Sequence, residues 1–176
     1  MIVLITGDFC TGKDLTADML VQQSRLIHDC EKFEKIQSYT TRKPRYEGER
    51  THTFCTVEQY KDFLEKGQII AETKINDNYY FTTKSQFDDK KINLYVIDDK
   101  GIKDVVESDI DDVYIIEVIR PVWLRDCPEG RLNRDRQSEP YKFTSDYRII
   151  NDGDIEKLKA SVLACFNNII KVKKSL

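Results

Sequence analysis

A loop suited to phosphate binding lies near the start of the chain, at residues 7–14 (Gly-Asp-Phe-Cys-Thr-Gly-Lys-Asp). An apolar run from Met1 to Thr6 precedes it, and a helix-like run from Leu15 to Ile27 follows it. Glycines at both ends let such a loop curl until successive backbone N–H groups converge on one phosphate, and the next helix adds its positive dipole end. The order strand, loop, helix therefore predicts a site for nucleotide phosphates, with Lys13 reaching the terminal ones.

The last loop position departs from the usual pattern, which has Ser or Thr to hold Mg²⁺. Asp14 stands there instead. Its hard carboxylate oxygens suit Mg²⁺ directly or through water, so we expect Mg²⁺ as a cofactor and Asp14 as its ligand. The structural alternative is a glycine turn that joins a strand to a helix by chance.

Composition limits the classes of protein that fit. A chain of 176 residues, 40% hydrophobic and 34% charged, is most simply one domain with small inserts. A net charge of −3 argues against a general nucleic-acid binder. No apolar run approaches the roughly 20 residues of a membrane span. The five scattered cysteines lack the spacing of a zinc or redox site, which favours reduced thiols and a cytoplasmic location.

Arginines gather in two segments of the chain. Arg42, Arg45 and Arg50 form one group, and several more lie between residues 120 and 136. The planar fork of arginine binds phosphate oxygens in pairs, so two groups beside a phosphate loop suggest several phosphates held at once. A solvated basic surface is the alternative.

Hydrophobic periodicity predicts strands and helices in alternation. Strands are expected at residues 2–6, 33–39, 69–75, 78–82, 92–97, 113–119 and 147–150, and helices at 15–27, 57–66, 100–106 and 154–172. This order predicts an α/β fold, with a mostly parallel sheet covered by helices on both faces. Ligands bind such sheets at the carboxyl ends of the strands, where the phosphate loop also lies.

Two segments do not fit the sheet. Residues 40–82 are polar and aromatic with short strands, which suggests a small inserted subdomain over the phosphate loop. Residues 120–145 are rich in arginine and lack a clear period, which favours a mobile lid over an ordinary surface loop. We therefore expect one domain over 1–176, with a core made of residues 1–39, 83–119 and 146–176.

Five short motifs resemble those of guanylate kinases, and they occur in the same order. Residues 38–45 look like the family's Ser-x-Thr-Thr-Arg-x-Pro-Arg, and residues 78–82 look like Asn-Tyr-Tyr-Gly-Thr. Asp98 with Gly101 is similar to its Asp-x-x-Gly, residues 131–139 to its lid and residues 149–152 to its Val-Asn-Asp. The resemblance covers nearly the whole chain and implies a P-loop NTPase-type fold with a monophosphate-binding insert and a short lid.

The resemblance also implies a role for each matched position. ATP would be bound by Gly7, Thr11, Gly12, Lys13, Asp14 and Asn151. The monophosphate would be bound by Ser38, Arg42, Arg45, His52, Tyr80 and Asp98, where His52 stands in place of a family tyrosine. Lys13, Arg131 and Arg134 would be catalytic, because the lid arginines balance the charge of the transferring phosphoryl group.

Three departures from the family pattern bear on specificity. Ala71 stands where the family has a glutamate that reads guanine, and the adjacent Glu72 should face the other side of its strand. Losing such a carboxylate commonly costs about 1–3 kcal/mol, so we expect weak guanine selectivity. The Gly-Lys-Asp end of the loop resembles phage-type deoxynucleoside monophosphate kinases and phosphomevalonate kinases. The lid is also short.

These features together predict an ATP-dependent nucleoside monophosphate kinase that uses Mg²⁺. The acceptor is expected to be GMP, dGMP or a related (deoxy)nucleoside monophosphate, without nucleic acid or membrane as partner, and the protein a monomer or homodimer. The alternative is a non-catalytic guanylate-kinase-like module that binds a nucleotide or a protein. The presence of Lys13, Arg42, Arg45 and two lid arginines favours the enzyme.

Overall fold

The computed structural model describes residues 1–27, 32–108, 110–126 and 142–175. Arg131 and Arg134, and with them most of the expected lid, lie outside the described residues.

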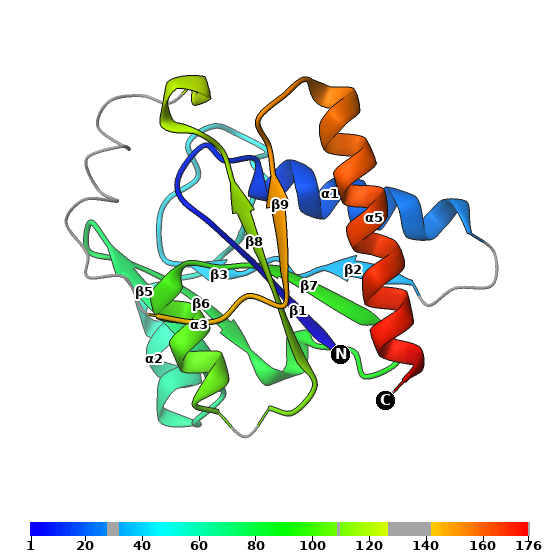
Figure 1. Cartoon of the computed structure of the whole chain (residues 1–176). Coiled ribbons are helices and arrows are strands. Elements are labelled where there is room, and N and C mark those ends of the chain that lie inside the picture. The colour runs from blue at the N-terminus through cyan, green and yellow to red at the C-terminus, as the bar shows by residue number, and fades with distance from the viewer. Residues whose placement is uncertain (28–31, 109, 127–141, 176) are drawn as a thin grey trace.

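The central sheet has five parallel strands in the order β2-β7-β1-β8-β9 (Figure 1). The strands are β1 (Ile2–Thr6), β2 (Phe33–Lys35), β7 (Ile92–Val96), β8 (Val113–Ile119) and β9 (Tyr147–Ile150). The predicted α/β class with a parallel sheet is confirmed. Because β1 lies in the middle of this sheet, the loop that follows it emerges at the centre of the carboxyl edge.

Both faces of β1 are buried. Val3 and Ile5 belong to one hydrophobic cluster, and Ile2 and Leu4 belong to another on the opposite face. The first cluster includes residues of α1 (Lys13–Leu26) and α5 (Ile155–Lys174), and the second includes residues of α3 (Asp99–Val106). A strand covered on both faces has no polar alternation, which explains the continuous apolar run at the start of the chain.

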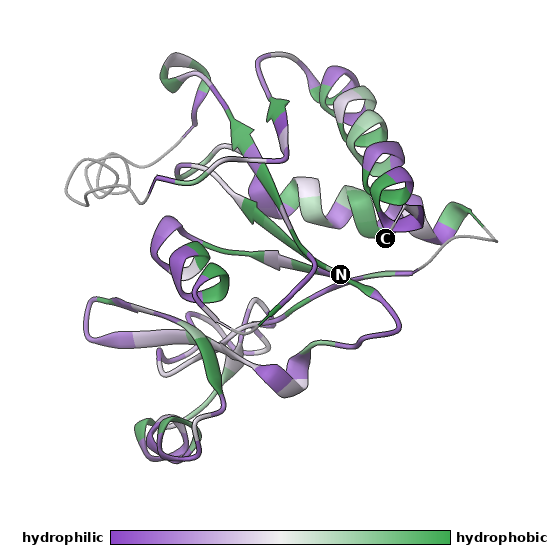
Figure 2. Ribbon diagram, turned by 60° about the horizontal axis from the view of Figure 1, so that its bottom comes forward, coloured by the Kyte–Doolittle hydropathy of each residue, from purple (hydrophilic) through white to green (hydrophobic). Residues whose placement is uncertain are grey.

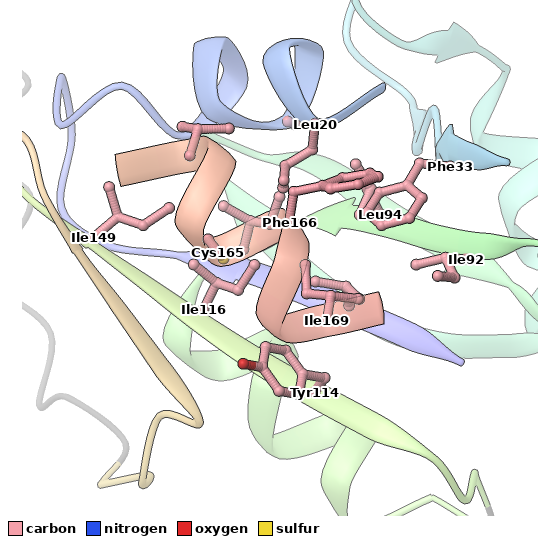
Figure 3. Packing of buried hydrophobic residues seen from close by; sticks show 14 of the residues in the cluster. Leu20, Phe33, Ile92, Leu94, Tyr114, Ile116, Ile149, Cys165, Phe166 and Ile169 are labelled. Carbon is pink, nitrogen blue, oxygen red and sulfur yellow. The ribbon is translucent and has the colours of Figure 1, made fainter. Parts of the chain in front are cut away.

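The larger cluster lies between α1, α5 and the sheet. Figure 3 shows Leu20 of α1 and Phe166 of α5 pointing toward Leu94 in the sheet. The ring centroids of Phe33 and Phe166 are 5.0 Å apart, so α5 also covers the edge strand β2. In Figure 2 the ribbon of α5 alternates hydrophilic and hydrophobic bands, as an amphipathic surface helix should.

A second, four-stranded sheet stands beside the first, in the order β4-β3-β6-β5. Its strands are β3 (Tyr39–Thr40), β4 (Thr53–Phe54), β5 (Ile69–Ile75) and β6 (Asn78–Thr83), and α2 (Val57–Glu65) joins β4 to β5. The ring centroids of Tyr60 on α2 and Phe81 on β6 are 5.3 Å apart. The helix α2 therefore packs on one face of this sheet. On the other face, Ala71 of β5 packs in the cluster that contains residues of α3.

Local sequence explains some boundaries of the second sheet better than others. Asn76 and Asp77 have φ values of 47° and 61°, the left-handed pair that a tight hairpin needs, as their polar side chains predicted. The strand expected over residues 33–39 is wrong in extent, because β2 ends at Lys35 and the chain then crosses to the second sheet as β3. The two-residue strand β4 is too short to produce a periodic signal.

No helix in the described ranges is long and apolar enough to cross a membrane. Cys55 and Cys165 are free. Cys10 is disulfide-bonded, so the expectation of reduced thiols is wrong at that position.

Candidate active site

The phosphate loop packs so closely against the sheet that its two glycines cannot be replaced. Gly7 has a φ of 139°, and a Cβ there would lie 2.1 Å from the carbonyl oxygen of Val118 on β8. Gly12 has a φ of 98°, and its Cβ would lie 2.9 Å from Nδ2 of Asn151. Both positions also have left-handed backbone that disfavours side chains. The loop is thus held against the ends of β8 and β9.

Asn151 connects the end of β9 to the phosphate loop. Its Nδ2 donates to the carbonyl oxygen of Thr11 at 2.9 Å. Arg120 at the end of β8 donates from Nη1 to the carbonyl and to Oδ1 of Asn151, at 3.1 and 2.9 Å. Asn151 was expected on the ATP side and does lie against the loop. Arg120 was not singled out, although it belongs to the second arginine-rich segment.

Lys13 folds back over its own loop. Its Nζ donates to the carbonyl oxygens of Gly7 and Asp8, at 2.6 and 2.7 Å. Anionic phosphate oxygens are stronger acceptors of a charged donor than carbonyls are. The ammonium is therefore already positioned where phosphate groups in the loop would attract it.

Asp14 lies at the start of α1 and pairs with a neighbouring strand. Its Oδ1 is 3.0 Å from Nζ of Lys35 at the end of β2, and the Asp14 side chain is 76% exposed. Lys35 also lies 3.0 Å from Asp18. A metal that used Asp14 would have to compete with Lys35 for this carboxylate.

A second carboxylate beside the loop was not predicted. Thr6, the last residue of β1, donates from Oγ1 to Oδ1 of Asp99 at 3.2 Å. Burial raises the pKa of Asp99, and the negative charges of Asp98 and Asp8 add to this rise, while Lys13 opposes it. Asp99 therefore places a carboxyl group beside the start of the loop.

The first arginine group is organised around a buried carboxylate, Glu49, whose side chain is fully buried. Arg42 donates two hydrogen bonds to this carboxylate, from Nη1 to Oε2 at 3.1 Å and from Nη2 to Oε1 at 2.9 Å. Glu49 also accepts from the backbone N–H of Arg45 and from Oγ1 of Thr51, both at 2.6 Å. These hydrogen bonds, led by that from Arg42, hold the pKa of Glu49 far below its usual range.

Glu49 therefore fixes both the side chain of Arg42 and the backbone of Arg45. Glu49 was not predicted as a site residue, although an acidic residue four positions after Arg45 and next to Gly48 is an available signal in that segment. A bidentate pair of this kind sets the direction of the guanidinium plane. Arg42 is consequently preorganised before any ligand arrives.

Ser38, His52 and Tyr80 lie together on the second sheet. Oγ of Ser38 and Nδ1 of His52 are 2.9 Å apart, and the rings of His52 and Tyr80 are 5.3 Å apart. Burial, with the nearby charge of Arg42, lowers the pKa of His52, which favours a neutral imidazole. In the register of the sheet, Tyr80 pairs with Thr40 and Thr73, so these residues share its face.

On β5, Glu72 and Ala71 face opposite sides of the sheet, as the alternation of a strand predicts. Glu72 accepts from the hydroxyl of Tyr60 at 2.6 Å, on the α2 side of the sheet. Ala71 is 2% exposed and belongs to the cluster that contains α3 residues. The hydroxyl of Thr73 donates instead to Oδ1 of Asp98 at 2.9 Å, so this hydrogen bond links β5 to the start of α3. Thr73 was missed because nothing in its local pattern distinguishes it.

The buried pair of Arg42 and Glu49 predicts a specific pH effect. Because the folded-state pKa of Glu49 lies below the ordinary 4.5, its ionised form adds stability above that pH, and this is lost as pH falls toward the folded-state pKa. We expect Glu49→Gln to melt at a lower temperature at pH 7 and to lose less stability on acidification. Thermal melting between pH 7 and pH 3 measures both.

Glu47→Gln is a matched control, because the exposed Glu47 lies two positions away. It should leave the acid limb of the stability curve unchanged. Identical pH profiles for Glu49→Gln and the wild type would contradict the role given to Glu49.

Known proteins were compared with the chain as a whole. No protein-family model matches it. A protein named guanylate kinase from Clostridium perfringens (strain 13 / Type A) is 26% identical over a 198-residue alignment that covers 100% of this chain and 88% of that protein. A guanylate kinase from Cupriavidus pinatubonensis is 30% identical over 152 residues, covering 72% and 68%.

A solved structure gives the same result for the fold. The crystal structure of guanylate kinase from Anaplasma phagocytophilum superposes with a TM-score of 0.63 at 21% sequence identity. The match covers 97% of this chain and 85% of the other. At that identity the match shows the common fold.

Proposed function

The chain belongs to the guanylate kinase family and is a nucleoside monophosphate kinase, and from this premise we propose that it transfers the γ-phosphate of ATP to GMP, dGMP or a related (deoxy)nucleoside monophosphate. One observation carries the proposal. The phosphate loop, which contains Lys13, follows the middle strand of the central sheet. Arg42, held in place by Glu49, lies beside the second sheet. Two anion sites on two sheets suit a reaction between two phosphates.

The donor side is the loop. Backbone N–H groups of residues 7–14 and the N-terminus of α1 would bind the ATP phosphates, with Thr11 and Asn151 holding the loop in shape. Lys13 would leave the carbonyls of Gly7 and Asp8 for the terminal phosphates. Its charge would then be strongest where the transferring phosphoryl group becomes most negative.

The acceptor side is the second sheet. Arg42, Arg45, Tyr80 and His52 would bind the phosphate of the monophosphate. Ser38 and Asp98 would lie toward the base. The neutral imidazole of His52 can donate or accept a hydrogen bond without adding charge. Arg131 and Arg134 would close over the reacting phosphates, although they lie outside the described residues.

Mg²⁺ suits the side chains around the loop. Among the residues that the structure describes, no group of three side chains could hold a metal alone. Mg²⁺ ordinarily uses one or two carboxylates together with substrate phosphates, which fits Asp14 as a ligand once ATP is bound. When bound, the ion would supply positive charge that balances the phosphates. Lys35 would then release Asp14.

Base selectivity tests the acceptor assignment. Ala71, buried beside α3, stands where the family has a glutamate that accepts hydrogen bonds from guanine, so that position supplies no carboxylate. We expect turnover with GMP or dGMP to exceed that with the next best monophosphate by only about ten-fold. Stronger discrimination requires that the wrong base leave a buried polar group of the site unpaired. Chromatography of products from ATP with each common (deoxy)nucleoside monophosphate measures this ratio.

Thr73→Val is the informative variant, because it removes the hydroxyl and keeps the shape of the side chain. It should change the ratio between bases and leave the affinity for the monophosphate group unchanged. Thr53→Val, on the edge strand β4, is the matched control. Absolute guanine specificity in the wild type, unaffected by Thr73→Val, would contradict this assignment of the base pocket.

The non-catalytic alternative is not favoured. A binding module has no need for a lysine directed at the terminal phosphates of a donor. Here Lys13 lies in a loop of the required shape, and the chain belongs to a family named for its kinase activity.

A further inference from the structure

The phosphate loop contains a carboxylate that should oppose its own ligand. Asp8 follows Gly7, and its backbone is fixed in place, because its carbonyl oxygen accepts from Oγ1 of Thr11 at 3.0 Å and from Nζ of Lys13 at 2.7 Å. A negative side chain at this position repels the phosphates of a nucleotide across a few ångströms. A loop built in this way needs a nearby cation that cancels the charge of Asp8.

Arg125 supplies that cation. Its Nη2 lies 2.6 Å from Oδ2 of Asp8, and the Arg125 side chain is only 7% exposed, whereas that of Asp8 is 56% exposed. Its Nε donates to the carbonyl oxygen of Arg120 at 2.8 Å. An arginine fixed by a carbonyl and a carboxylate has already lost most of its side-chain freedom, so the pair is stronger than an ordinary surface ion pair.

The backbone between Arg120 and Arg125 is built to present this guanidinium. It forms the short 3-10 helix η2 (Val122–Leu124), closed by the hydrogen bond from the N–H of Arg125 to the carbonyl of Val122 at 3.1 Å. Arg120 is in turn held by Asn151, which holds the loop. Figure 1 shows the loop after β1, η2 and the connection from β9 to α5 at the same edge of the molecule.

The charge of Asp8 affects a neighbouring carboxyl group, that of Asp99. Asp8 contributes, after burial and Asp98, to raising the pKa of Asp99, whose carboxylate accepts a hydrogen bond from Oγ1 of Thr6. The carboxylate of Asp8 thus adds negative charge near the loop. Arg125 acts on the source of that charge.

We propose that Arg125 is a positioning residue of the donor site, which neutralises Asp8 so that the loop can accept the phosphates of a nucleoside triphosphate. The proposal rests on the proposed function, because it takes the loop as the ATP site. Arg125 acts through Asp8 and does not itself contact the phosphates. Neutralising Asp8 should therefore restore the ATP binding that removing the Arg125 side chain alone weakens.

Calorimetric titration of the full chain with Mg²⁺-ATP tests this in a double-mutant cycle. Losing one charge-assisted interaction and leaving Asp8 unpaired should weaken ATP binding about ten-fold in Arg125→Ala. Asp8→Asn alone should bind ATP at least as tightly as the wild type. The ATP affinity of the double variant Asp8→Asn/Arg125→Ala should return to within about three-fold of the wild-type value, because the unpaired charge of Asp8 is then absent.

Arg148→Ala is the matched control, because it removes the same charge from an arginine paired with Glu117 on the sheet. It should bind ATP as the wild type does. GMP binding should be equal in all five proteins, and thermal melting shows which of them are folded.

Three outcomes overturn the proposal. Equal ATP affinity in Arg125→Ala and the wild type removes the need for neutralisation. A loss in Arg125→Ala that Asp8→Asn does not restore means that Arg125 contacts the nucleotide directly. An equal loss in Arg148→Ala means that only net charge matters. A wild type that binds no ATP refutes the proposed function instead, so the two failures are distinguishable.

Discussion

Lys13→Ala should lower the turnover number by about 10²–10³-fold, the range typical of removing one charged group that stabilises a transition state. Lys13 already lies within the loop, held by two carbonyls at 2.6 and 2.7 Å, so its loss removes a positioned charge from the terminal phosphates. ATP affinity should fall much less than turnover, because the backbone N–H groups of the loop remain. Steady-state kinetics at saturating ATP and GMP measure the effect.

Lys91→Ala provides the control for Lys13→Ala. Lys91 is a partly exposed lysine paired with Glu34 at the sheet edge, and its loss should not change turnover. A folded Lys13→Ala protein with wild-type turnover would contradict the assignment of the loop as the donor site.

Arg42→Ala should raise the KM for the monophosphate by about 10²-fold, as expected when a guanidinium that can hold a phosphate with two hydrogen bonds is lost. ATP binding should change little, because Arg42 belongs to the second sheet. The same change leaves Glu49 buried without its charged partner, so this variant should also melt at a lower temperature. Kinetics and thermal melting therefore report two separate effects.

The double variant Arg42→Ala/Glu49→Gln separates these effects. Neutralising the buried carboxylate should recover part of the lost stability, while the KM for the monophosphate stays high. If KM recovers together with stability, Arg42 serves the fold and does not bind the acceptor. Equal losses of ATP and monophosphate affinity in Arg42→Ala would also contradict the assignment.

Local patterns predicted the parts of the fold that depend on a strong period or on special backbone angles. The run from Ile2 to Thr6 is a strand because it is buried on both faces, and the loop after it has glycines where φ is positive. The hairpin at Asn76 and Asp77 follows from side chains that tolerate left-handed backbone. Each of these signals is contained in a few consecutive residues.

The sequence could not predict interactions between distant segments. Arg125 and Asp8 are 117 positions apart, and Asp99 and Thr6 are 93 apart, so no spacing rule relates them. Thr73 meets Asp98 only because α3 packs against β5. Glu49 was easier to predict, because it lies within the first arginine group. Its contacts, such as the hydrogen bond from Thr51, still depend on the folded turn.

The role of Asp14 shows how the structure sharpens a sequence-based expectation. The motif alone suggests a metal ligand, whereas the structure gives this carboxylate a salt bridge to Lys35. The two statements describe states before and after nucleotide binding if Lys35 yields to Mg²⁺. Asp14 therefore stays a proposed ligand that must change its partner.

The most direct measurement follows the γ-phosphate itself. The wild-type chain is mixed with Mg²⁺, GMP and ATP labelled on the γ-phosphate, and the products are separated. We predict that the label appears in the β-phosphate of GDP, in amounts equal to the ADP formed, and that Lys13→Ala at the same concentration transfers it about 10²–10³-fold more slowly. Binding of both nucleotides without labelled diphosphate from any monophosphate, or label found only in free phosphate, would contradict a phosphoryl transfer between two bound nucleotides.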